Sequence, residues 1–315
     1  MKFNHQLAIV IPAFKVEYFE QTLNSLCSQT CLNFSVYVGD DCSEHDLFKI
    51  VRSYSNSLDI KYKRFSNNLG QTDLVGHWRR CIDMVEKEQW ILLFSDDDLL
   101  GPTCIDDFYI TKSKFPDIKL FRYKCLRIDS HERVIKKDTY NDHNINAGRY
   151  FDQRIKYDIQ SFAVEYIFDK EIYNRIGGHE SFPLAWCSDD SLWIKMLIET
   201  KVKSIAGSPV YWRYSGKNIS SINSSSSSML KMQACLDYLS WAKTFFKYND
   251  ISVASSETDI LVWYIMHTYN TTGLRNVNSS IKWLKIYMRK FNVHTQILLH
   301  AIIRSISYMI QSRIR

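Results

Sequence analysis

The amino-acid sequence predicts an α/β fold with a mixed, mainly parallel sheet flanked by helices, followed by a helical C-terminal extension. Over the first hundred residues, short apolar runs alternate with segments of helical spacing, which is typical of parallel strands joined by helices. The 315 residues are 45% hydrophobic and 23% charged, as in soluble globular proteins. This length favours two domains, or one large domain with an appendage.

The first elements follow from the spacing of apolar residues. Residues 7–11 form a continuous apolar run that ends at Pro12, as expected for a strand buried on both faces. Phe19, Leu23 and Leu26 then recur at helical spacing. The elements expected next are strands at 34–38, 60–65 and 90–94, and a helix at 71–88.

The middle of the chain is less regular, and its end is helical. We expect strands at 119–126 and 161–168, a polar stretch at 129–149 between them, and a helix at 189–199. The serine run 224–228 is interpreted as a flexible connector. Everything after this run has helical spacing, so we expect a catalytic or binding domain at 1–222 and a helical extension at 223–315.

The cysteines and the charge distribution indicate the cellular compartment and the parts of the chain that are basic. Eight cysteines occur without the paired spacing of a zinc site, which favours free thiols in a reducing, cytoplasmic compartment. No apolar run approaches the roughly 18 residues that span a bilayer. The net charge is +6, yet eight cations and no acid follow Asp259, so residues 1–259 carry a net charge of −2.

Two acidic clusters follow predicted strands. Asp40 and Asp41 come after the second strand, and Asp96, Asp97 and Asp98 come after the strand at 90–94. In α/β sheets, ligands bind beyond the carboxyl ends of parallel strands. Adjacent carboxylates repel one another unless a cation compensates them, and Mg²⁺ or Mn²⁺ prefers carboxylates together with phosphate oxygens. The alternative is that the three aspartates only cap the following helix.

Five motifs in chain order resemble family 2 glycosyltransferases, which have the GT-A fold. The motifs are Pro12-Ala13-Phe14, the segment Ser25 to Thr30, Asp40-Asp41-Cys42-Ser43, Asn68-x-Gly70 and Ser95-Asp96-Asp97-Asp98. The resemblance covers roughly residues 5–222. It implies a GT-A catalytic domain at 1–222, with a nucleotide-sugar half at about 1–100 and an acceptor half at about 101–222. Lys15 stands where the family usually has Asn, and Cys42 where it usually has Gly.

The resemblance implies roles on the donor side. Asp41 would accept a hydrogen bond from the base, most often uracil, and the expected nucleotide-binding residues are Pro12, Ala13, Phe14, Asp40, Asp41, Asn68 and Asp96. Asp97, together with Asp98, would hold Mn²⁺ or Mg²⁺ against the two phosphates, where the ion stabilises the leaving nucleoside diphosphate. We expect this acidic site to be solvated.

The resemblance also implies roles on the acceptor side. Inverting transfer needs a carboxylate that takes the proton of the acceptor hydroxyl. The segment 186–193 resembles the family's acidic motif at a helix start, which makes Asp189 the expected base and Asp190 the alternative. Both acids at a helix start also fit a purely structural role facing the helix dipole. Arg213 and Lys217 are candidate diphosphate contacts, or members of an exposed basic loop.

The extension suggests a surface role. In residues 281–315, Ile281, Leu284, Met288 and Phe291 recur at helical spacing beside a basic stripe. From Ile297 onward, a polar ridge that runs from His300 to Arg315 divides an otherwise apolar helix. The helices either pack against the catalytic domain or a partner subunit, or lie on an anionic membrane surface.

The resemblance as a whole implies an inverting glycosyltransferase. It would move a sugar from a nucleotide donor, expected to be UDP, to a saccharide or lipid-linked saccharide in surface polysaccharide assembly, at the inner face of the plasma membrane. We expect no nucleic-acid partner, and the pattern specifies neither the sugar nor the oligomeric state. The alternatives are a non-catalytic nucleotide-sugar-binding module and a sugar nucleotidyltransferase, although the latter would want a Gly-rich phosphate loop near the N-terminus. A Rossmann oxidoreductase is excluded by the missing G-x-G-x-x-G.

Overall fold

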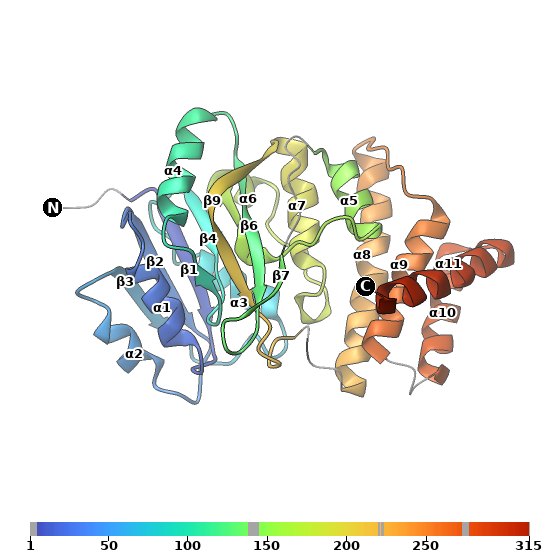
Figure 1. The fold of residues 1–315 in the computed structure, drawn as a ribbon, viewed down its shortest axis with the longest axis horizontal. Coiled ribbons are helices and arrows are strands. Elements are labelled where there is room, and N and C mark those ends of the chain that lie inside the picture. The colour runs from blue at the N-terminus through green and yellow to red at the C-terminus, as the bar shows by residue number, and fades with distance from the viewer. Residues whose placement is uncertain (1–4, 138–144, 220, 222–223, 273–276, 315) are drawn as a thin grey trace. The chain divides into compact units, whose positions relative to one another are not determined.

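The computed structural model describes residues 5–137, 145–219, 221, 224–272 and 277–314. The chain forms two compact units (Figure 1). The first unit comprises residues 1–147, 160–181 and 188–221, and the second comprises 148–159, 182–187 and 222–315. The predicted boundary at 222 therefore leaves out two earlier segments. The first of them groups with the second unit because Asp152 accepts hydrogen bonds from the backbone of Ala254 and Ser255, at 2.8 and 2.6 Å.

The first unit is built on a nine-stranded mixed sheet, whose main path runs in the order β3-β2-β1-β4-β8-β6-β9-β5, with β7 paired to β6. The pairs β1–β2, β1–β4, β2–β3 and β6–β9 are parallel, and the others are antiparallel. The strands are β1 Leu7–Ala13, β2 Phe34–Asp40, β3 Asp59–Arg64, β4 Trp90–Leu93, β5 Leu99–Leu100, β6 Leu120–Ile128, β7 Val134–Lys137, β8 Tyr166–Asp169 and β9 Val202–Arg213. The prediction of a mixed sheet flanked by helices is confirmed.

The helices of the first unit connect these strands. They are α1 Phe19–Cys27, α2 Leu47–Ser53, α3 Leu74–Ile82, α4 Cys104–Lys114, α6 Lys170–Arg175 and α7 Ser188–Glu199. Two predictions were too long. The helix expected at 71–88 starts only at Leu74, because the Asp73 carboxylate caps it by accepting from Gly76 N at 2.9 Å. The strand expected at 161–168 begins only at Tyr166, after a short 3₁₀ turn at Ala163–Glu165.

The register of the parallel strands determines where the candidate site lies. Ala13 at the end of β1 pairs with Asp40 at the end of β2, and Val10 pairs with Leu93 at the end of β4. All three strands are almost entirely buried, which explains their continuous apolar sequences. Their carboxyl ends therefore meet at one edge of the sheet, and both acidic clusters follow directly from that edge.

The second unit is helical. It contains most of α5 Ala147–Ile155, the 3₁₀ turn Pro183–Ala185, and α8 Ser225–Tyr248, α9 Glu257–Thr272, α10 Val277–Phe291 and α11 Thr295–Ile314. The interpretation of the serine run as a flexible connector was wrong. Residues 225–228 form the first turn of α8, and the Ser224 hydroxyl accepts from Ser227 N at 3.2 Å as the N-cap. Among the described residues, every helix is too short or too polar to traverse a lipid bilayer.

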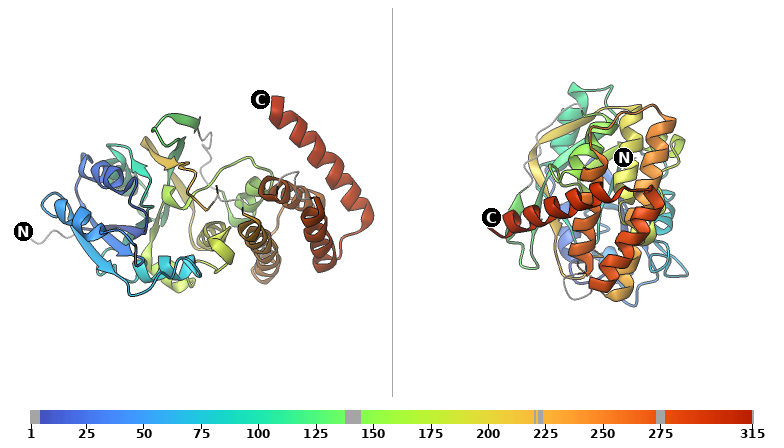
Figure 2. Two further views of the ribbon diagram at one scale, coloured as in Figure 1. Left: turned by 90° about the horizontal axis from the view of Figure 1, so that it is seen from below. Right: turned by 90° about the vertical axis from the view of Figure 1, so that its right-hand side faces the viewer.

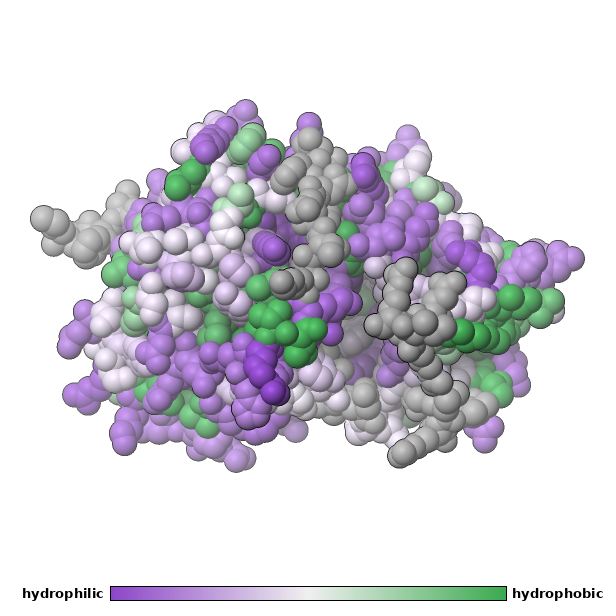
Figure 3. All heavy atoms as spheres, viewed as in Figure 1, coloured by the Kyte–Doolittle hydropathy of each residue, from purple (hydrophilic) through white to green (hydrophobic). Residues whose placement is uncertain are grey.

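The last two helices bury only part of their apolar surface. On α10, Trp283 and Tyr287 are buried, whereas Ile281 is exposed. Helix α11 packs on α9 (Figure 2) through the small residues Ala301 and Ser305. Four large apolar side chains of α11 are exposed, namely Leu299, Ile303, Ile306 and Ile310. Figure 3 shows hydrophobic surface in this part of the molecule. The predicted polar ridge ends at Arg315, which lies outside the described residues.

Candidate functional site

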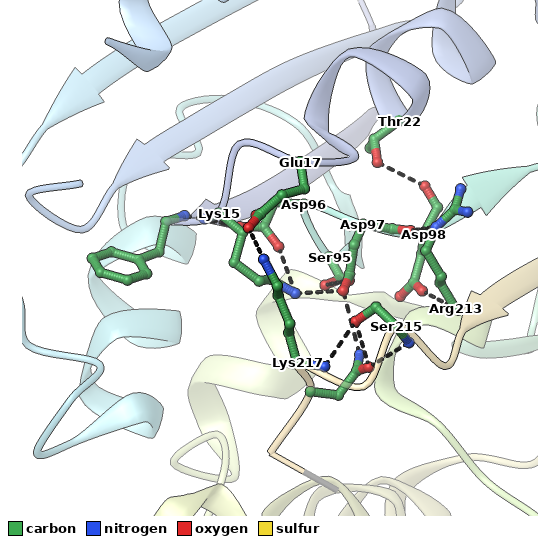
Figure 4. A network of polar contacts seen from close by, with 12 residues as sticks. Lys15, Glu17, Thr22, Ser95, Asp96, Asp97, Asp98, Arg213, Ser215 and Lys217 are labelled. Atoms are coloured by element: carbon green, nitrogen blue, oxygen red, sulfur yellow. Dashed lines mark hydrogen bonds and ion pairs between the residues drawn. The ribbon is translucent and has the colours of Figure 1, made fainter. Parts of the chain in front are cut away.

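The site begins where β1 and β4 end side by side. Oδ2 of Asp96 accepts hydrogen bonds from the backbone N–H groups of Phe14 and Lys15, at 2.9 and 2.7 Å. The Lys15 side chain then folds back, so that its Nζ lies 3.1 Å from Oδ1 of Asp96 and also donates to Oδ2 of Asp97 (Figure 4). One lysine therefore joins the turn after β1 to two of the three aspartates after β4.

All three aspartates of this cluster are buried. Oδ1 of Asp97 accepts from the Ser95 hydroxyl at 2.6 Å, and Oδ2 accepts from Asn218 Nδ2 at 3.3 Å as well as from Lys15. Asp98 points away from Lys15 and accepts the backbone N–H of Arg213 at 2.7 Å (Figure 4). The expectation of a solvated acidic site was wrong, because β9 and the segment after it cover the cluster.

Burial raises the pKa of both Asp96 and Asp98. Burial, together with the charge of Asp97, raises the pKa of Asp98 well above its ordinary value. Its Oδ2 is buried without a hydrogen-bond partner among the described atoms, which suits a protonated carboxyl. For Lys15, burial alone would lower the pKa, but the charges of Asp96 and Asp97 outweigh burial and raise it. Lys15 is therefore a stable cation, and its charge compensates the aspartates.

The cluster does not fit a resident divalent cation in this arrangement. Each of the four carboxylate oxygens of Asp96 and Asp97 already accepts a hydrogen bond or pairs with the Lys15 ammonium. A metal ion would have to displace that ammonium. Within the described part of the chain, no group of three or more His, Cys, Asp or Glu residues is arranged to hold a metal. Metal binding by Asp97 and Asp98 stays a prediction from the resemblance.

Asp41 organises a second cluster at the end of β2. Its carboxylate is buried and accepts the backbone N–H groups of Leu69 and Gly70, at 2.9 and 2.8 Å. It also accepts from the Arg80 guanidinium on α3. A Cβ on Gly70 would lie 2.6 Å from Oδ2 of Asp41, so only glycine allows this close approach. Asn68 supports the same loop by accepting from Gln71 N at 3.0 Å.

Asp40 has a structural role inside the sheet. Its Oδ2 accepts from the Tyr62 hydroxyl at 2.5 Å and pairs with Arg64 at 2.9 Å, both on β3, and Oδ1 accepts from Ser43 N at 2.8 Å. Because these partners surround a fully buried side chain, Asp40 joins β2 to β3. Its expected contact with nucleotide stays a prediction that this packing does not favour.

The turn after β1 connects the two clusters. The backbone N–H of Asp41 donates to the Ala13 carbonyl at 2.9 Å, and the Ser43 hydroxyl donates to the Phe14 carbonyl at 2.7 Å. Pro12 is partly buried, while the Phe14 side chain is 41% exposed. The structure therefore brings Pro12 to Phe14, Asp41 and Asp96 together, with an accessible aromatic ring at the edge of the sheet.

Asp189 and Asp190 lie elsewhere, in the first turn of α7. Asp190 is buried, whereas Asp189 is partly exposed. The residues just before the helix have an unusual backbone, because Leu184, Ala185 and Cys187 all have positive φ values of 58°, 52° and 66°. Strained backbone of this kind gathers at functional sites. Of the two acids, Asp189 is the more exposed.

The two candidate phosphate contacts differ in their surroundings. Arg213 does not belong to an exposed loop, as one interpretation had it. Its guanidinium is buried and donates to the Asp97 carbonyl at 2.8 Å, to Gln21 at 2.9 Å and to Glu132 at 3.3 Å. Lys217 is exposed and pairs with Glu17. Arg213 therefore holds the backbone beneath the cluster, and Lys217 is the more exposed of the two cations.

Two site residues have roles that the sequence did not predict. In the sequence, Lys15 stands out only because the family usually has Asn at this position. Its place directly after the turn that ends β1 is the sequence feature that points to a role in the site. Arg80 gave no signal, because a basic residue on an amphipathic helix usually faces solvent. Here its guanidinium lies over the Phe65 ring, 3.9 Å from the ring centroid, and pairs with Asp41.

Comparisons with known proteins show which proteins this chain resembles. Residues 8–123 match the sequence profile described as glycosyl transferase family 2. The poly(ribitol-phosphate) beta-N-acetylglucosaminyltransferase TarS of Staphylococcus aureus is 29% identical over 105 residues, which are 32% of this chain and 18% of TarS. An uncharacterised glycosyltransferase of Haemophilus influenzae is 27% identical over 198 residues, 61% of this chain and 62% of that protein. The chain thus matches less than two thirds of the length of either relative.

Solved structures show the same fold. Residues 1–349 of S. aureus TarS in complex with UDP-GlcNAc superpose with a TM-score of 0.65 and 14% identity, covering 96% of this chain and 88% of that one. GalNAc-T7 with UDP, GalNAc and Mn²⁺ gives a TM-score of 0.57 at 10% identity, covering 92% and 57%. The expected GT-A fold is confirmed by these likenesses.

Proposed function

Because this chain carries a family 2 glycosyltransferase domain, we propose that it transfers a sugar from a nucleotide donor to a saccharide acceptor, with inversion at the anomeric carbon. One observation carries the proposal. The carboxyl ends of three parallel strands bring Phe14, Asp41 and Asp96 to the edge of the sheet where α/β proteins bind ligands. We propose UDP as the donor nucleotide, which the complex of TarS with UDP-GlcNAc supports.

Two side chains are suited to hold the base. The exposed ring of Phe14 offers an apolar face at the sheet edge. Asp41 is held rigidly by Leu69, Gly70 and Arg80, and a carboxylate has about four acceptor positions, so one remains for a donor N–H of the base. These contacts prepare the carboxylate before the nucleotide arrives, which reduces the entropy cost of binding.

Asp189 is the proposed base. It lies in the first turn of α7 and is the more exposed of the two acids at that position. In the proposed step, the acceptor oxygen forms a bond to the anomeric carbon while the bond from that carbon to the diphosphate breaks. The proton of the acceptor hydroxyl passes to Asp189, and the electron pair of the broken bond stays on the nucleoside diphosphate.

A donor screen tests this function. Release of nucleoside diphosphate is measured from UDP-GlcNAc, UDP-glucose, UDP-galactose and GDP-mannose, with and without saccharide acceptors, and the Asp189→Asn variant is the control. Faster release with an acceptor, lost in the variant, is the expected result. Nucleotide-sugar binding without turnover for any donor and acceptor would instead identify a non-catalytic binding module.

We further propose that the acceptor is lipid-linked and that the second unit docks on an anionic membrane at the inner face of the plasma membrane. The exposed apolar residues of α11 follow a spacing of four, three and four, so they form one stripe along the helix; they are Leu299, Ile303, Ile306 and Ile310. Helix α10 carries the exposed cations Lys282, Lys285 and Arg289. Apolar burial together with basic charge is the combination that holds a helix in a membrane interface.

A further inference from the structure

The Lys15 ammonium occupies the position between the Asp96 and Asp97 carboxylates. Its Nζ lies 3.1 Å from Oδ1 of Asp96 and donates to Oδ2 of Asp97 (Figure 4). The side chain remains 25% exposed, whereas both aspartates are almost fully buried. Two buried carboxylates therefore hold the ammonium, and the Lys15 side chain as a whole stays partly accessible to solvent.

A glycosyl donor presents a diphosphate, and the diphosphate gains negative charge as the sugar leaves. A cation at that place stabilises the transition state, whether it is a metal ion or a fixed side chain. Resting on the proposed function, we propose that Lys15 is the resident cation of this donor site. Its ammonium contacts the diphosphate and balances the charge that develops there, so that nucleotide binding and transfer proceed without a divalent ion.

The two other cations near the aspartate cluster, Arg213 and Lys217, are less suited to contact the diphosphate. The Arg213 guanidinium is buried and already donates to Gln21, Glu132 and the Asp97 carbonyl. Lys217 pairs with Glu17, and its ammonium is exposed, so water screens its charge. Of these three cations, Lys15 is the one that pairs with buried carboxylates while its own side chain stays partly exposed.

The first experiment measures nucleotide binding by isothermal titration calorimetry, with UDP and GDP as probes, in EDTA and in MnCl₂. Wild-type protein should bind one nucleotide with the same affinity in both buffers. Lys15→Asn should lose about tenfold to a hundredfold of that affinity in EDTA, because a charge-assisted contact is lost, and Mn²⁺ should restore it. Lys49→Asn removes the same charge from the exposed face of α2 and should bind like wild type. A wild-type affinity that falls tenfold or more in EDTA would overturn the proposal.

The second experiment needs no nucleotide. Lys15→Asn leaves two buried carboxylates without their cation, so its melting temperature should fall by roughly 5–15 °C. Mn²⁺ should restore most of that loss in the variant and leave wild type unchanged, and Lys15→Arg should melt near wild type. Stabilisation of wild type by Mn²⁺ to the same extent as the variant would show that the metal displaces Lys15, and would overturn the proposal.

The two experiments separate the two proposals. Failure to bind either nucleotide in any buffer contradicts the proposed function, and the melting curves then still decide whether Lys15 is the resident cation. Nucleotide binding that requires Mn²⁺ contradicts the role of Lys15 and leaves the proposed function in place.

Discussion

Arg80 of α3 pairs with the buried carboxylate of Asp41, and the same guanidinium stacks 3.9 Å from the centroid of the Phe65 ring. This contact joins α3 to the end of β2, next to the loop that Asp41 holds through Leu69 and Gly70. The pair therefore helps to hold the loop in position and compensates the charge of Asp41.

Replacing Arg80 tests that relationship. Arg80→Met leaves a buried carboxylate without its cation, and because the arginine is partly exposed we expect a loss of about 2–4 kcal/mol in the free energy of unfolding. Urea denaturation measures it. Arg52→Met, on the exposed face of α2, should change stability by less than about 0.5 kcal/mol. Equal stability of the two variants would show that the Asp41 pair contributes nothing.

Asp189→Asn tests the base. The amide keeps the shape but accepts no proton, so turnover should fall by roughly 10²–10⁴-fold. Nucleotide affinity should be unchanged, because the carboxylate serves the acceptor. Steady-state kinetics and calorimetry together make the test. Asp190→Asn is the matched control. Because Asp190 is buried, this variant should have a lower melting temperature, and its turnover should stay close to that of wild type. The reverse pattern would make Asp190 the base.

His179 makes the fold sensitive to acid. It is buried beside Trp78 and Tyr173, and burial, with the nearby charges of Arg79 and Lys195, lowers its pKa to about 3. As the pH falls below about 6.5, His179 therefore takes up a proton in the unfolded chain before it does so in the folded protein. The free energy of unfolding then decreases from about pH 6.5 towards pH 3. At pH 5 the loss from this residue should be about 2 kcal/mol.

The measurement is the change in unfolding free energy between pH 7.5 and pH 5, in wild type and in His179→Gln. The variant should lose about 2 kcal/mol less than wild type over this interval, whatever its absolute stability. His45→Gln, at an exposed position, should show the wild-type dependence. An unchanged dependence in His179→Gln would mean that this histidine is protonated in the folded protein.

The exposed stripe of α11 tests the membrane proposal. Leu299→Glu combined with Ile303→Glu should abolish flotation with anionic vesicles at low salt, because it adds negative charge and removes apolar contact area. Both side chains are exposed, so the melting temperature should stay near that of wild type. Ile110→Glu, on the exposed face of α4, should float like wild type. Absence of wild-type flotation would leave these helices with a structural role.

The alternation of buried strands and helices could be read from the sequence, because apolar periodicity is a local property of the chain. The same holds for the acidic clusters at the strand ends, since Asp41 and Asp96 directly follow apolar runs. The boundaries of α3 and the state of the serine run could not be read in this way. They depend on single N-cap residues, such as Asp73 and Ser224. The side-chain hydrogen bonds of these residues set where a helix begins, and the composition of the surrounding sequence does not reveal them.

By itself, the sequence determined the α/β class, the alternation of the first strands and helices, and the edge of the sheet where the donor should bind. Only the tertiary structure decided that Lys15 reaches Asp97 across 82 positions of sequence, and that Asp98 is buried against Arg213 at the end of β9. The reason is physical. The charge state and accessibility of a carboxylate depend on which distant groups pack against it, and that follows from strand register and burial rather than from neighbouring residues.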